Sequence, residues 1–406
     1  MLRSLYVDFN SYFASVEQQA EPALRGKPVC VAPVAAETTC CIAASYEAKA
    51  FGVKTGTPVH EARKLCKAIR VVQARPSLYV EYHHRLVTAV ESCTHVEAVY
   101  SIDEMHCELT GSQRNRANAE ALAHRIKRTI RAAVGTELHC SIGIAPNIFL
   151  AKTASDMHKP DGLTVIEQAD LPECLYPLEL RDITGVGRQM EKRLNQAGIG
   201  TMRELLAADT TQLARAWGSI EGERMYAKLR GEWLLPAPSA RASVGHSHVL
   251  APEMRDDRAA CAVLHKLLQK AAVRLRSYGL LAGAMQVKVK YRRYPSWHEQ
   301  VRFDPSADTL TLTGALDLLW RKKPAMRDDP IAVGVTLTRL VEAAHHTPSL
   351  FDENAARSTL NHTIDTLNAR FGKNAVYFGG AHDALQSAPM RIAFGHIPDL
   401  EAESDE

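Results

Sequence analysis

Three acidic residues stand where the chain could place metal-binding carboxylates. Asp8 ends the short apolar run Leu2–Val7, which is typical of a buried strand. Asp103 and Glu104 lie within residues 97–109, which alternate like two short strands around a turn. Mg²⁺ prefers hard oxygen ligands, and two such ions about 3.5–4 Å apart support nucleotidyl transfer. The acids therefore predict a two-metal site, although Asp103 and Glu104 alone would also suit an ordinary acidic turn.

A second group of residues could bind phosphate. In the segment Ser45–Val53, Tyr46 and Lys49 are three residues apart and would share one helix face, where a phenol and an ammonium group can hold triphosphate oxygens. Lys159 precedes Pro160 at the end of a helical pattern, where its point charge suits phosphate. Taken separately, the segment could be a plain amphipathic helix and Lys159 a solvated surface lysine.

The stretch Ile183–Thr201 is typical of a helix–hairpin–helix. It has Gly185 and Gly187, then a helical pattern, then a Gly-Ile pair. Backbone N–H groups near a helix start can hold a DNA phosphate without reading base sequence. The alternative is a tight helical turn within a core, since glycine often ends helices.

The elements that must position these residues fall into two α+β parts. Up to about residue 166 the pattern is strand, helix, hairpin, helix, strand, which is typical of a ferredoxin-like sandwich. Short helices with glycine punctuation follow, and the Pro- and Ala-rich stretch Leu235–Arg241 is typical of a linker. From Ser243 a repeated strand–helix–strand pattern predicts a second, smaller α+β unit.

Composition limits the class of protein. The 406 residues are too many for one compact core, and 46% hydrophobic with 23% charged residues is ordinary for a soluble globular protein. No apolar run reaches the ~18 residues of a membrane span, and the N-terminus lacks the blocks of a signal peptide. The nine cysteines form no C-x-x-C pair, which argues against a zinc site or a disulfide framework and predicts buried free thiols in a reducing, cytoplasmic compartment.

Charge is distributed unevenly. Residues 343–406 hold four Lys or Arg against nine Asp or Glu, so residues 1–342, with 45 basic and 37 acidic side chains, carry a net +8. A basic body suits a polyanionic partner. Four basic residues on one strand and its exit could follow a phosphate backbone in a salt-dependent way, or could merely be a solvated strand that resists aggregation; they are Lys288, Lys290, Arg292 and Arg293.

In this order, the segments resemble the Y-family of DNA polymerases, of the bacterial DNA polymerase IV type, over about residues 1–342. The matching segments are Val7–Glu17 and Tyr100–Glu104 for the metal motifs, and Ser45–Val53, Ala151–Gly162 and Ile183–Thr201 for the fingers, palm and thumb. The resemblance implies an α+β, multidomain right-hand fold with a ferredoxin-like palm. The implied domains are a palm (1–10 and 78–166), fingers (11–77), a helix–hairpin–helix thumb (167–234), a linker (235–242), an α+β little finger (243–342) and an acidic tail (343–406).

The resemblance also implies roles for the acids. Asp8, Asp103 and the backbone carbonyl of Phe9 would hold the triphosphate-side Mg²⁺, and Asp8, Asp103 and Glu104 the catalytic one.

On the nucleotide, Phe13 corresponds to the family's steric gate, whose ring lies where a ribose 2′-hydroxyl would project. Tyr12 would lie beside the sugar and triphosphate. The phosphates themselves would be contacted by Tyr46, Lys49 and Lys159.

Three positions depart from the family pattern. Asn10 stands where members usually have Asp, with little effect expected because that acid is not a principal metal ligand. Lys49 replaces an Arg, so a planar bidentate group becomes a point charge and nucleotide affinity should be weaker. Ile148, after Asn147, replaces a Lys and removes one expected DNA or phosphate contact.

The C-terminal segment is similar in part to family tails. Thr347–Phe351 resembles the short peptide by which bacterial polymerases bind the sliding clamp, although that motif usually opens with Gln. Beyond it, Leu360–Gly372 has a helical pattern and Ala375–Phe378 a strand-like one.

The function implied is that of an error-prone, translesion DNA-directed DNA polymerase, a monomer acting on primer–template DNA and dNTPs. The main alternative is a catalytically inactive relative that serves as a DNA-binding adaptor for another polymerase. Because all three acids are present, the enzyme is favoured. A nucleotide cyclase would explain the acids but neither the thumb motif nor the basic second unit.

Overall fold

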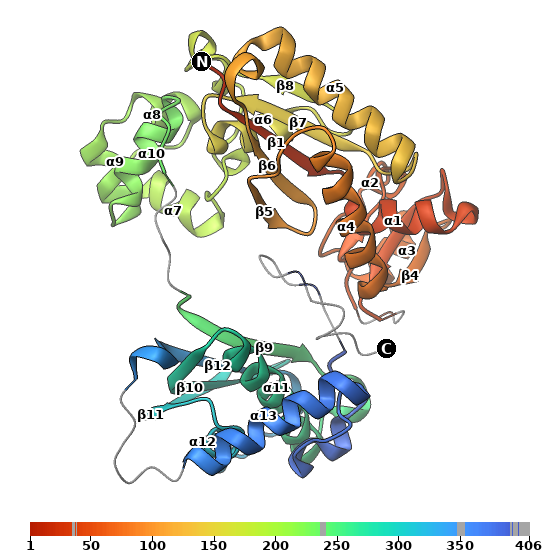
Figure 1. Cartoon of the computed structure of the whole chain (residues 1–406), viewed down its shortest axis with the longest axis vertical. Coiled ribbons are helices and arrows are strands. Elements are labelled where there is room, and N and C mark those ends of the chain that lie inside the picture. Colours follow the sequence, from red (N-terminus) through yellow and green to blue (C-terminus); the bar gives the residue numbers. More distant parts are fainter. Residues whose placement is uncertain are drawn as a thin grey trace. The chain divides into compact units, whose positions relative to one another are not determined.

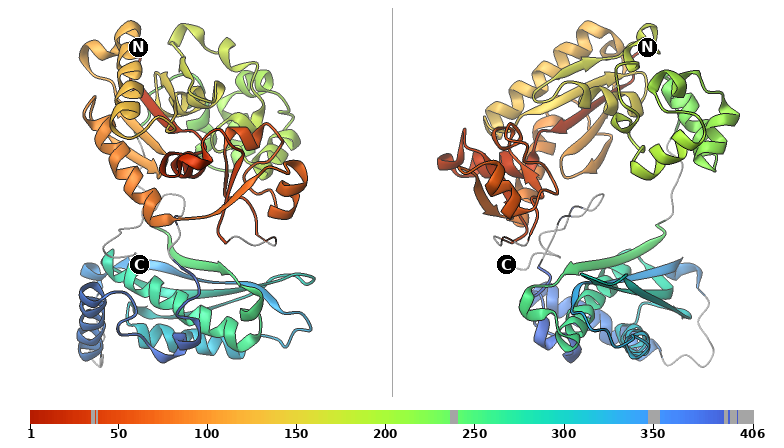
Figure 2. Two further views of the ribbon diagram at one scale, coloured as in Figure 1. Left: turned by 90° about the vertical axis from the view of Figure 1, so that its right-hand side faces the viewer. Right: turned by 180° about the vertical axis from the view of Figure 1, so that it is seen from behind.

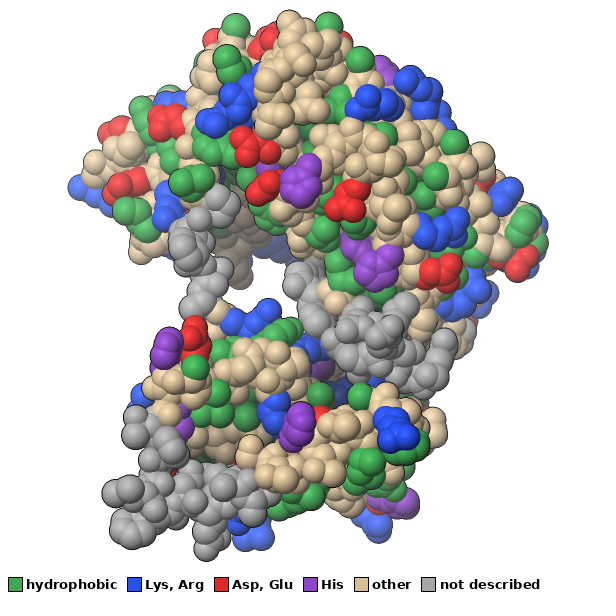
Figure 3. Space-filling model, in the orientation of Figure 1, with side chains coloured by type: hydrophobic (Ala, Val, Ile, Leu, Met, Phe, Trp, Pro, Cys, Tyr) green, Lys and Arg blue, Asp and Glu red, His purple; other side chains and the backbone are tan. Residues whose placement is uncertain are grey.

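The chain folds into two compact units, shown in Figures 1 and 2. Among the described residues, unit 1 holds Met1 to Leu235 with Ile392 and Ile397, and unit 2 holds Arg241 to Pro389. The computed structural model describes residues 1–34, 37, 39–235, 241–346, 354–389, 392 and 397. Within these residues, no helix is long and apolar enough to cross a bilayer. On the face of unit 1 seen in Figure 3, basic and acidic side chains are interspersed.

A five-stranded sheet forms the centre of unit 1, in the order β5-β6-β1-β7-β8. The central strand β1 is antiparallel to both of its neighbours and buried along its whole length. The order β5-β6-β1-β7, with helices α4 and α5 packed together, is that of a split βαβ fold and confirms the ferredoxin-like expectation. The elements are β1 (Ser4–Phe9), α4 (Pro76–Glu91), β5 (Ala98–Ser101), β6 (Glu104–Glu108), α5 (Arg116–Ala133), β7 (Cys140–Ala145), α6 (Ile148–Met157) and β8 (Leu163–Val165).

A smaller subdomain is inserted between β1 and α4. Its three-stranded sheet has the order β3-β2-β4, and its core is a separate cluster of small apolar side chains. The elements are α1 (Tyr12–Ala20), β2 (Val29–Ala32), β3 (Ala43–Ala44), α2 (Tyr46–Lys49), α3 (Val59–Leu65) and β4 (Arg70–Gln73).

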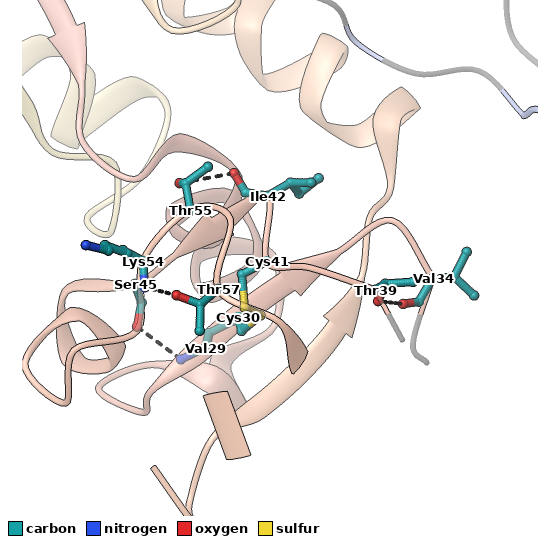
Figure 4. The surroundings of a disulfide bond; sticks show 10 residues. All are labelled: Val29, Cys30, Val34, Thr39, Cys41, Ile42, Ser45, Lys54, Thr55 and Thr57. Carbon is teal, nitrogen blue, oxygen red and sulfur yellow. Dashed lines mark hydrogen bonds between the residues drawn. A yellow bond between two sulfur atoms is a disulfide. The ribbon is translucent and has the colours of Figure 1, made fainter. Parts of the chain in front are cut away.

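This subdomain contains a disulfide between Cys30 and Cys41, shown in Figure 4. The expectation of free thiols throughout is wrong for this pair. The antiparallel pairing of β2 with β3 places Cys30 opposite Ala44, so that the chain just before β3 brings the two Cα atoms to 5.7 Å, a distance at which a disulfide forms. The seven other cysteines, all within described residues, are free thiols.

Short helices follow β8 and share a core with α6 and β1. Side-chain caps begin two of them: Thr201 accepts a hydrogen bond from the Glu204 amide and Asp209 one from the Gln212 amide. The helices are α7 (Arg188–Gln196), α8 (Met202–Ala207), α9 (Thr210–Trp217) and α10 (Glu221–Leu229).

Unit 2 is a four-stranded antiparallel sheet in the order β11-β10-β12-β9, with α11 and α12 packed on one face (Figure 2). Buried and exposed side chains alternate along β10 from Val287, as expected for a sheet covered on one side. The elements are β9 (Ser243–Val249), α11 (Asp257–Ser277), β10 (Leu280–Tyr291), β11 (Trp297–Ser306), α12 (Thr309–Arg321), β12 (Pro330–Glu342) and α13 (Asn354–Phe371).

In the C-terminal segment, the predicted helix is confirmed as α13, but the strand predicted at Ala375–Phe378 is not. Ala375 and Val376 form a bend, and Tyr377 and Phe378 have no regular structure, with no strand pairing among the described residues. Asn368 satisfies this backbone instead: its side-chain amide donates to the Val376 carbonyl at 2.8 Å and accepts from the Val376 amide at 2.9 Å. Hydrogen bonds to the Asn368 side chain are therefore formed here in place of the strand pairing that the apolar run predicted.

Candidate active site

The three predicted acids converge at one edge of the palm-like sheet. In the antiparallel pairing of β1 with β6, Asp8 lies directly opposite Glu104. The Phe9 amide donates to the Asp103 carbonyl at 2.9 Å, which fixes the hairpin turn against the end of β1. Asp8 is only 5% exposed, while Asp103 and Glu104 are half-buried. Residues about 95 positions apart are thus brought together by strand register alone.

Asp103 has an unusual electrostatic environment. Burial raises its pKa to about 6, and the charges of Asp8 and Glu104 add to the rise, while a hydrogen bond from Ser101 opposes it. The Ser101 hydroxyl donates to Asp103 Oδ1 at 2.6 Å, and its oxygen lies 3.3 Å from Glu104 Oε2. The cluster is therefore an electrostatically costly group of carboxylates that favours a nearby cation.

Two lysines supply that positive charge. Lys159, predicted as a phosphate contact, has its Nζ 2.7 Å from Asp8 Oδ1 and 2.8 Å from Asp156 Oδ1. Lys152 lies 2.5 Å from Asp8 Oδ2 and 2.7 Å from Glu104 Oε1. Burial would lower the pKa of either lysine, but the neighbouring carboxylates outweigh it and raise the pKa of both.

Sequence reasoning missed Lys152 and Asp156, although a signal was present. Lys152 and Asp156 are four residues apart on α6, hence neighbours on one helix face, and Lys159 follows three residues later. Two charges on one helix stripe, just upstream of a predicted phosphate ligand, could have indicated that α6 faces the site.

The carboxylates suit a divalent cation, but they are not arranged around a vacant point. Within the described residues, no three His, Cys, Asp or Glu side chains are positioned together to hold a metal ion. Asp8 and Glu104 instead both contact Lys152, and Asp103 accepts from Ser101. The ligand atoms are nevertheless carboxylate oxygens, which are hard donors of the kind that Mg²⁺ prefers.

The predicted steric gate, Phe13, is half-buried on α1. Its ring stacks on Tyr79 of α4, with centroids 4.5 Å apart and planes 20° apart. The Tyr79 hydroxyl donates to Glu17 at 2.7 Å, and Glu17, which is fully buried, also pairs with Arg75. This supporting group was not predicted, because its members come from two helices that are distant in the sequence.

Tyr12 is placed differently from Phe13. Its side chain is 3% exposed, and its hydroxyl donates to the Tyr79 carbonyl at 2.6 Å. Burial and the charge of Asp103 raise its pKa well above the usual value. The structure therefore brings Tyr12 close to the acids but turns its hydroxyl into the protein.

Tyr46 and Lys49 lie together on α2, as their spacing predicts. Lys49 Nζ is 4.2 Å from the centroid of the Tyr46 ring. Burial and the positive charge of Lys159 lower the pKa of Lys49, whereas Asp8 acts in the opposite direction. The charges of Lys159 and Asp8 thus act on Lys49 of α2.

One of the family departures, Asn10, has a structural explanation, and Asn147, which keeps the family pattern, has a similar structural role. Asn10 is buried, and its side chain donates to the Ser141 hydroxyl at 3.1 Å and accepts from the Asp161 amide at 2.8 Å. An aspartate at this position could only accept. Asn147 caps α6 by accepting from the Leu150 amide at 2.8 Å, and its amide group donates to carbonyls of the helical segment that follows β8. Both residues fix the backbone around the site.

The remaining predicted DNA contacts lie outside the acidic cluster. Gly185 has φ +89°, which a side chain would strain, and Gly187 is the N-cap residue of α7. In unit 2, Lys288 and Lys290 are exposed on one face of β10, and Arg292 is exposed in the loop beyond it. The side chain of Arg293 pairs with Asp328 at 3.3 Å.

Comparisons with known proteins agree with this geometry. Residues 7–156 match the impB/mucB/samB family, residues 241–350 match the C-terminal domain of that family, and residues 181–232 match the thumb domain described for DNA polymerase iota. DNA polymerase IV of Moorella thermoacetica is 34% identical over 382 residues, covering 92% of this chain and 94% of the relative. DNA polymerase IV 1 of Bacillus subtilis is 32% identical over 96% of this chain and 95% of that protein.

Solved structures show the same similarity. A Y-family chimera of the polymerases Dbh and Dpo4 superposes with a TM-score of 0.70 at 26% identity, covering 84% of this chain and 99% of that one. The insertion ternary complex of Dbh DNA polymerase gives 0.56 at 25% identity over 84% and 99%. With near full-length identity above 30% and a shared fold, the chain belongs to the Y-family of DNA polymerases, in the bacterial DNA polymerase IV group.

Proposed function

We propose that the chain adds dNTPs to a primer 3′-hydroxyl with Asp8, Asp103 and Glu104 as its catalytic acids. The family membership makes it an error-prone, translesion DNA-directed DNA polymerase. The observation that carries the residue assignment is the direct cross-strand pairing of Asp8 with Glu104, next to the Asp103 turn. An adaptor that has lost its chemistry would not need to keep all three carboxylates.

Enzymes of this family are metal-dependent, and in our proposal two Mg²⁺ ions, when bound, activate the primer hydroxyl and steady the leaving pyrophosphate. Asp8, Asp103 and the Phe9 carbonyl would hold one ion, and Asp8, Asp103 and Glu104 the other. The sheet contributes by fixing the backbone of these acids before substrate arrives.

The nucleotide would be held partly from the inserted subdomain and partly from the segment that follows α6. Lys159, which contacts Asp8, would bind the triphosphate together with Tyr46 and Lys49 of α2, since each offers a donor to phosphate oxygen. Phe13, held by its stack on Tyr79, would exclude a 2′-hydroxyl sterically. Tyr12 would support the sugar through its ring and backbone, because its hydroxyl is already bonded to a carbonyl.

The proposed domains follow the resemblance: palm 1–10 and 78–166, fingers 11–77, thumb 167–234, linker 235–242, little finger 243–342 and tail 343–406. DNA phosphates would be bound by the turn of Gly185 and Gly187 and by the basic strand of the little finger.

That strand has suitable neighbours. Lys288 pairs across β12 with Gly334, and Lys290 with Ala332. Ser247 of β9 lies beyond Gly334. The small residues on the β12 side of these lysines would leave room for a phosphate backbone to approach the sheet, with strong salt dependence expected.

Two further proposals concern partners. Thr347–Phe351, which lies outside the described residues, would bind the sliding clamp, on the strength of its sequence alone. The enzyme would act as a monomer in the cytoplasm, where its DNA substrate is found.

Primer extension on damaged and undamaged templates with Mg²⁺ and dNTPs tests the proposal. Asp103→Ala should abolish extension while primer–template binding, measured by fluorescence anisotropy, stays within about twofold, because the carboxylate contacts metal rather than DNA. Extension at the normal rate by Asp103→Ala would refute the assignment of the acids.

A further inference from the structure

Lys152 makes an unusual set of contacts at the edge of the catalytic sheet. Its Nζ contacts Asp8 of β1 at 2.5 Å, Glu104 of β6 at 2.7 Å and Asp156 of α6 at 3.1 Å. An ammonium group has three N–H donors and no acceptor. Lys152 donates to Asp8 and Asp156 and forms an ion pair with Glu104. Carboxylates from three different elements therefore surround this side chain, which is only 17% exposed.

The neighbouring Lys159 is not equivalent. It contacts the other oxygen of Asp8 at 2.7 Å and Asp156 at 2.8 Å. Of these two lysines, Lys152 is the one whose contacts join the acid of β1 to the acid of β6. Without a positive charge between them, two carboxylates placed opposite each other on paired strands would repel.

We propose that Lys152 is a positioning residue that competes with divalent cations for Asp8 and Glu104. This role rests on the metal site proposed above. In the absence of metal, the Lys152 ammonium group holds the two side-chain carboxylates close together. For a cation to use the same oxygens, Lys152 must release Asp8 Oδ2 and Glu104 Oε1.

After Lys152 has released Asp8 and Glu104, its ammonium group can keep its ion pair with Asp156. It is four residues from Lys152 on the same helix, so the contact between them does not depend on the acids of the sheet. Lys152 thereby weakens metal binding until nucleotide phosphates contribute further oxygen ligands, which makes occupancy of the site depend on substrate.

The test is metal binding in the absence of DNA and nucleotide. The full-length protein is titrated with Mn²⁺, and free Mn²⁺ is measured by electron paramagnetic resonance. Lys152→Met, which keeps most of the side-chain volume and removes the charge, should bind Mn²⁺ on the order of tenfold more tightly, since the positive charge that competes for Asp8 and Glu104 is lost. Lys67→Met, at an exposed lysine outside the site, is the matched control and should bind as the wild type does.

Thermal unfolding provides a second measurement. Lys152→Met should melt at a lower temperature than the wild type in EDTA, and added Mn²⁺ should raise its melting temperature more than that of the wild type. If the Met variant does not fold, Lys152→Gln gives the same comparison. Unchanged or weaker Mn²⁺ affinity in the uncharged variant would overturn the proposal.

Failure of the metal site itself has a different signature. Asp8→Asn and Glu104→Gln should each lose Mn²⁺ binding. If they keep it, the carboxylates do not form the metal site. If they lose it while Lys152→Met binds as the wild type does, the acids are correctly assigned and only the role of Lys152 is wrong.

Discussion

At the scale of single residues, the site combines negative charges that need a cation with positive charges that already neutralise part of them. Asp8 has both carboxylate oxygens in contact with lysines, one with Lys152 and one with Lys159. A buried ion pair stabilises the fold only when the attraction between its two charges outweighs the free energy of hydration that they lose. Removing one partner here would therefore leave an uncompensated charge, so single substitutions at the site must be read for stability as well as for activity.

The sugar selectivity of the enzyme should depend on one ring. Phe13→Ala is expected to raise incorporation of ribonucleotides relative to deoxyribonucleotides by roughly tenfold or more, because the volume that excludes the 2′-hydroxyl is lost. Single-nucleotide insertion kinetics with dCTP and CTP opposite dG measure this ratio. Tyr79→Phe, which keeps the stacked ring and removes the hydroxyl that reaches Glu17, serves as the control and should retain discrimination. An unaltered ratio in Phe13→Ala would exclude the gate role.

At the scale of elements, the sequence predicted those parts of the site that local patterns encode. The apolar run before Asp8 and the alternating segment around Asp103 identified two strands, and the order of motifs identified the family. The contacts of Lys152 could not be predicted this way, because its partners lie on β1 and β6 and are set by strand register and helix packing. The disulfide was missed for the same reason: Cys30 and Cys41 meet only through the β2–β3 pairing.

One element carries a buried histidine that should make the fold sensitive to acid. His106 on β6 is 1% exposed, and neither ring nitrogen has a hydrogen-bond partner among the described residues. Burial lowers its pKa from 6.5 to about 4. The folded state thus favours the neutral ring. The free energy of unfolding that depends on the neutral His106 ring is complete above pH ~6.5. It decreases by roughly 3 kcal/mol as the pH falls through 4.

His106→Gln, which cannot titrate, should therefore lose less stability than the wild type between pH 7.5 and 4.5. Urea unfolding at both pH values measures the difference. Because all other titrating groups are shared by the two proteins, equal losses would show that His106 does not set the acid sensitivity.

The disulfide should stabilise the inserted subdomain. Cys30 and Cys41 are 11 residues apart, and closing a loop of that length removes about 3 kcal/mol of unfolded-state entropy. A Cys30→Ser, Cys41→Ser double variant should unfold at lower urea concentration than the wild type under oxidising conditions and match it after reduction. The control is the same double change at the free thiols Cys66 and Cys93. The urea midpoint of this control variant should still decrease when the disulfide is reduced.

At the scale of the whole molecule, chemistry and DNA retention are assigned to different units. The acids belong to unit 1 and the basic strand to unit 2. Lys288→Ala with Lys290→Ala should weaken primer–template binding for all sequences alike and lower the slope of log K against log salt by roughly 2, one for each lost phosphate contact. Anisotropy titrations at several salt concentrations give the slope. Lys322→Ala, at the C-cap of α12 on the helical side of unit 2, should leave it unchanged.

The C-terminal segment is bound to unit 2 by contacts that do not depend on chain continuity. Arg276 of α11 makes a two-point ion pair with Asp365 of α13 at 2.7 and 2.8 Å, and Asn361 donates to Asp308 at 2.7 Å. Further along, the Lys266 ammonium group, itself buried, donates to the Leu385 and Ser387 carbonyls. A protease that cleaves once between His346 and Asn354 should therefore yield a nicked protein whose two fragments elute together and separate only in denaturant.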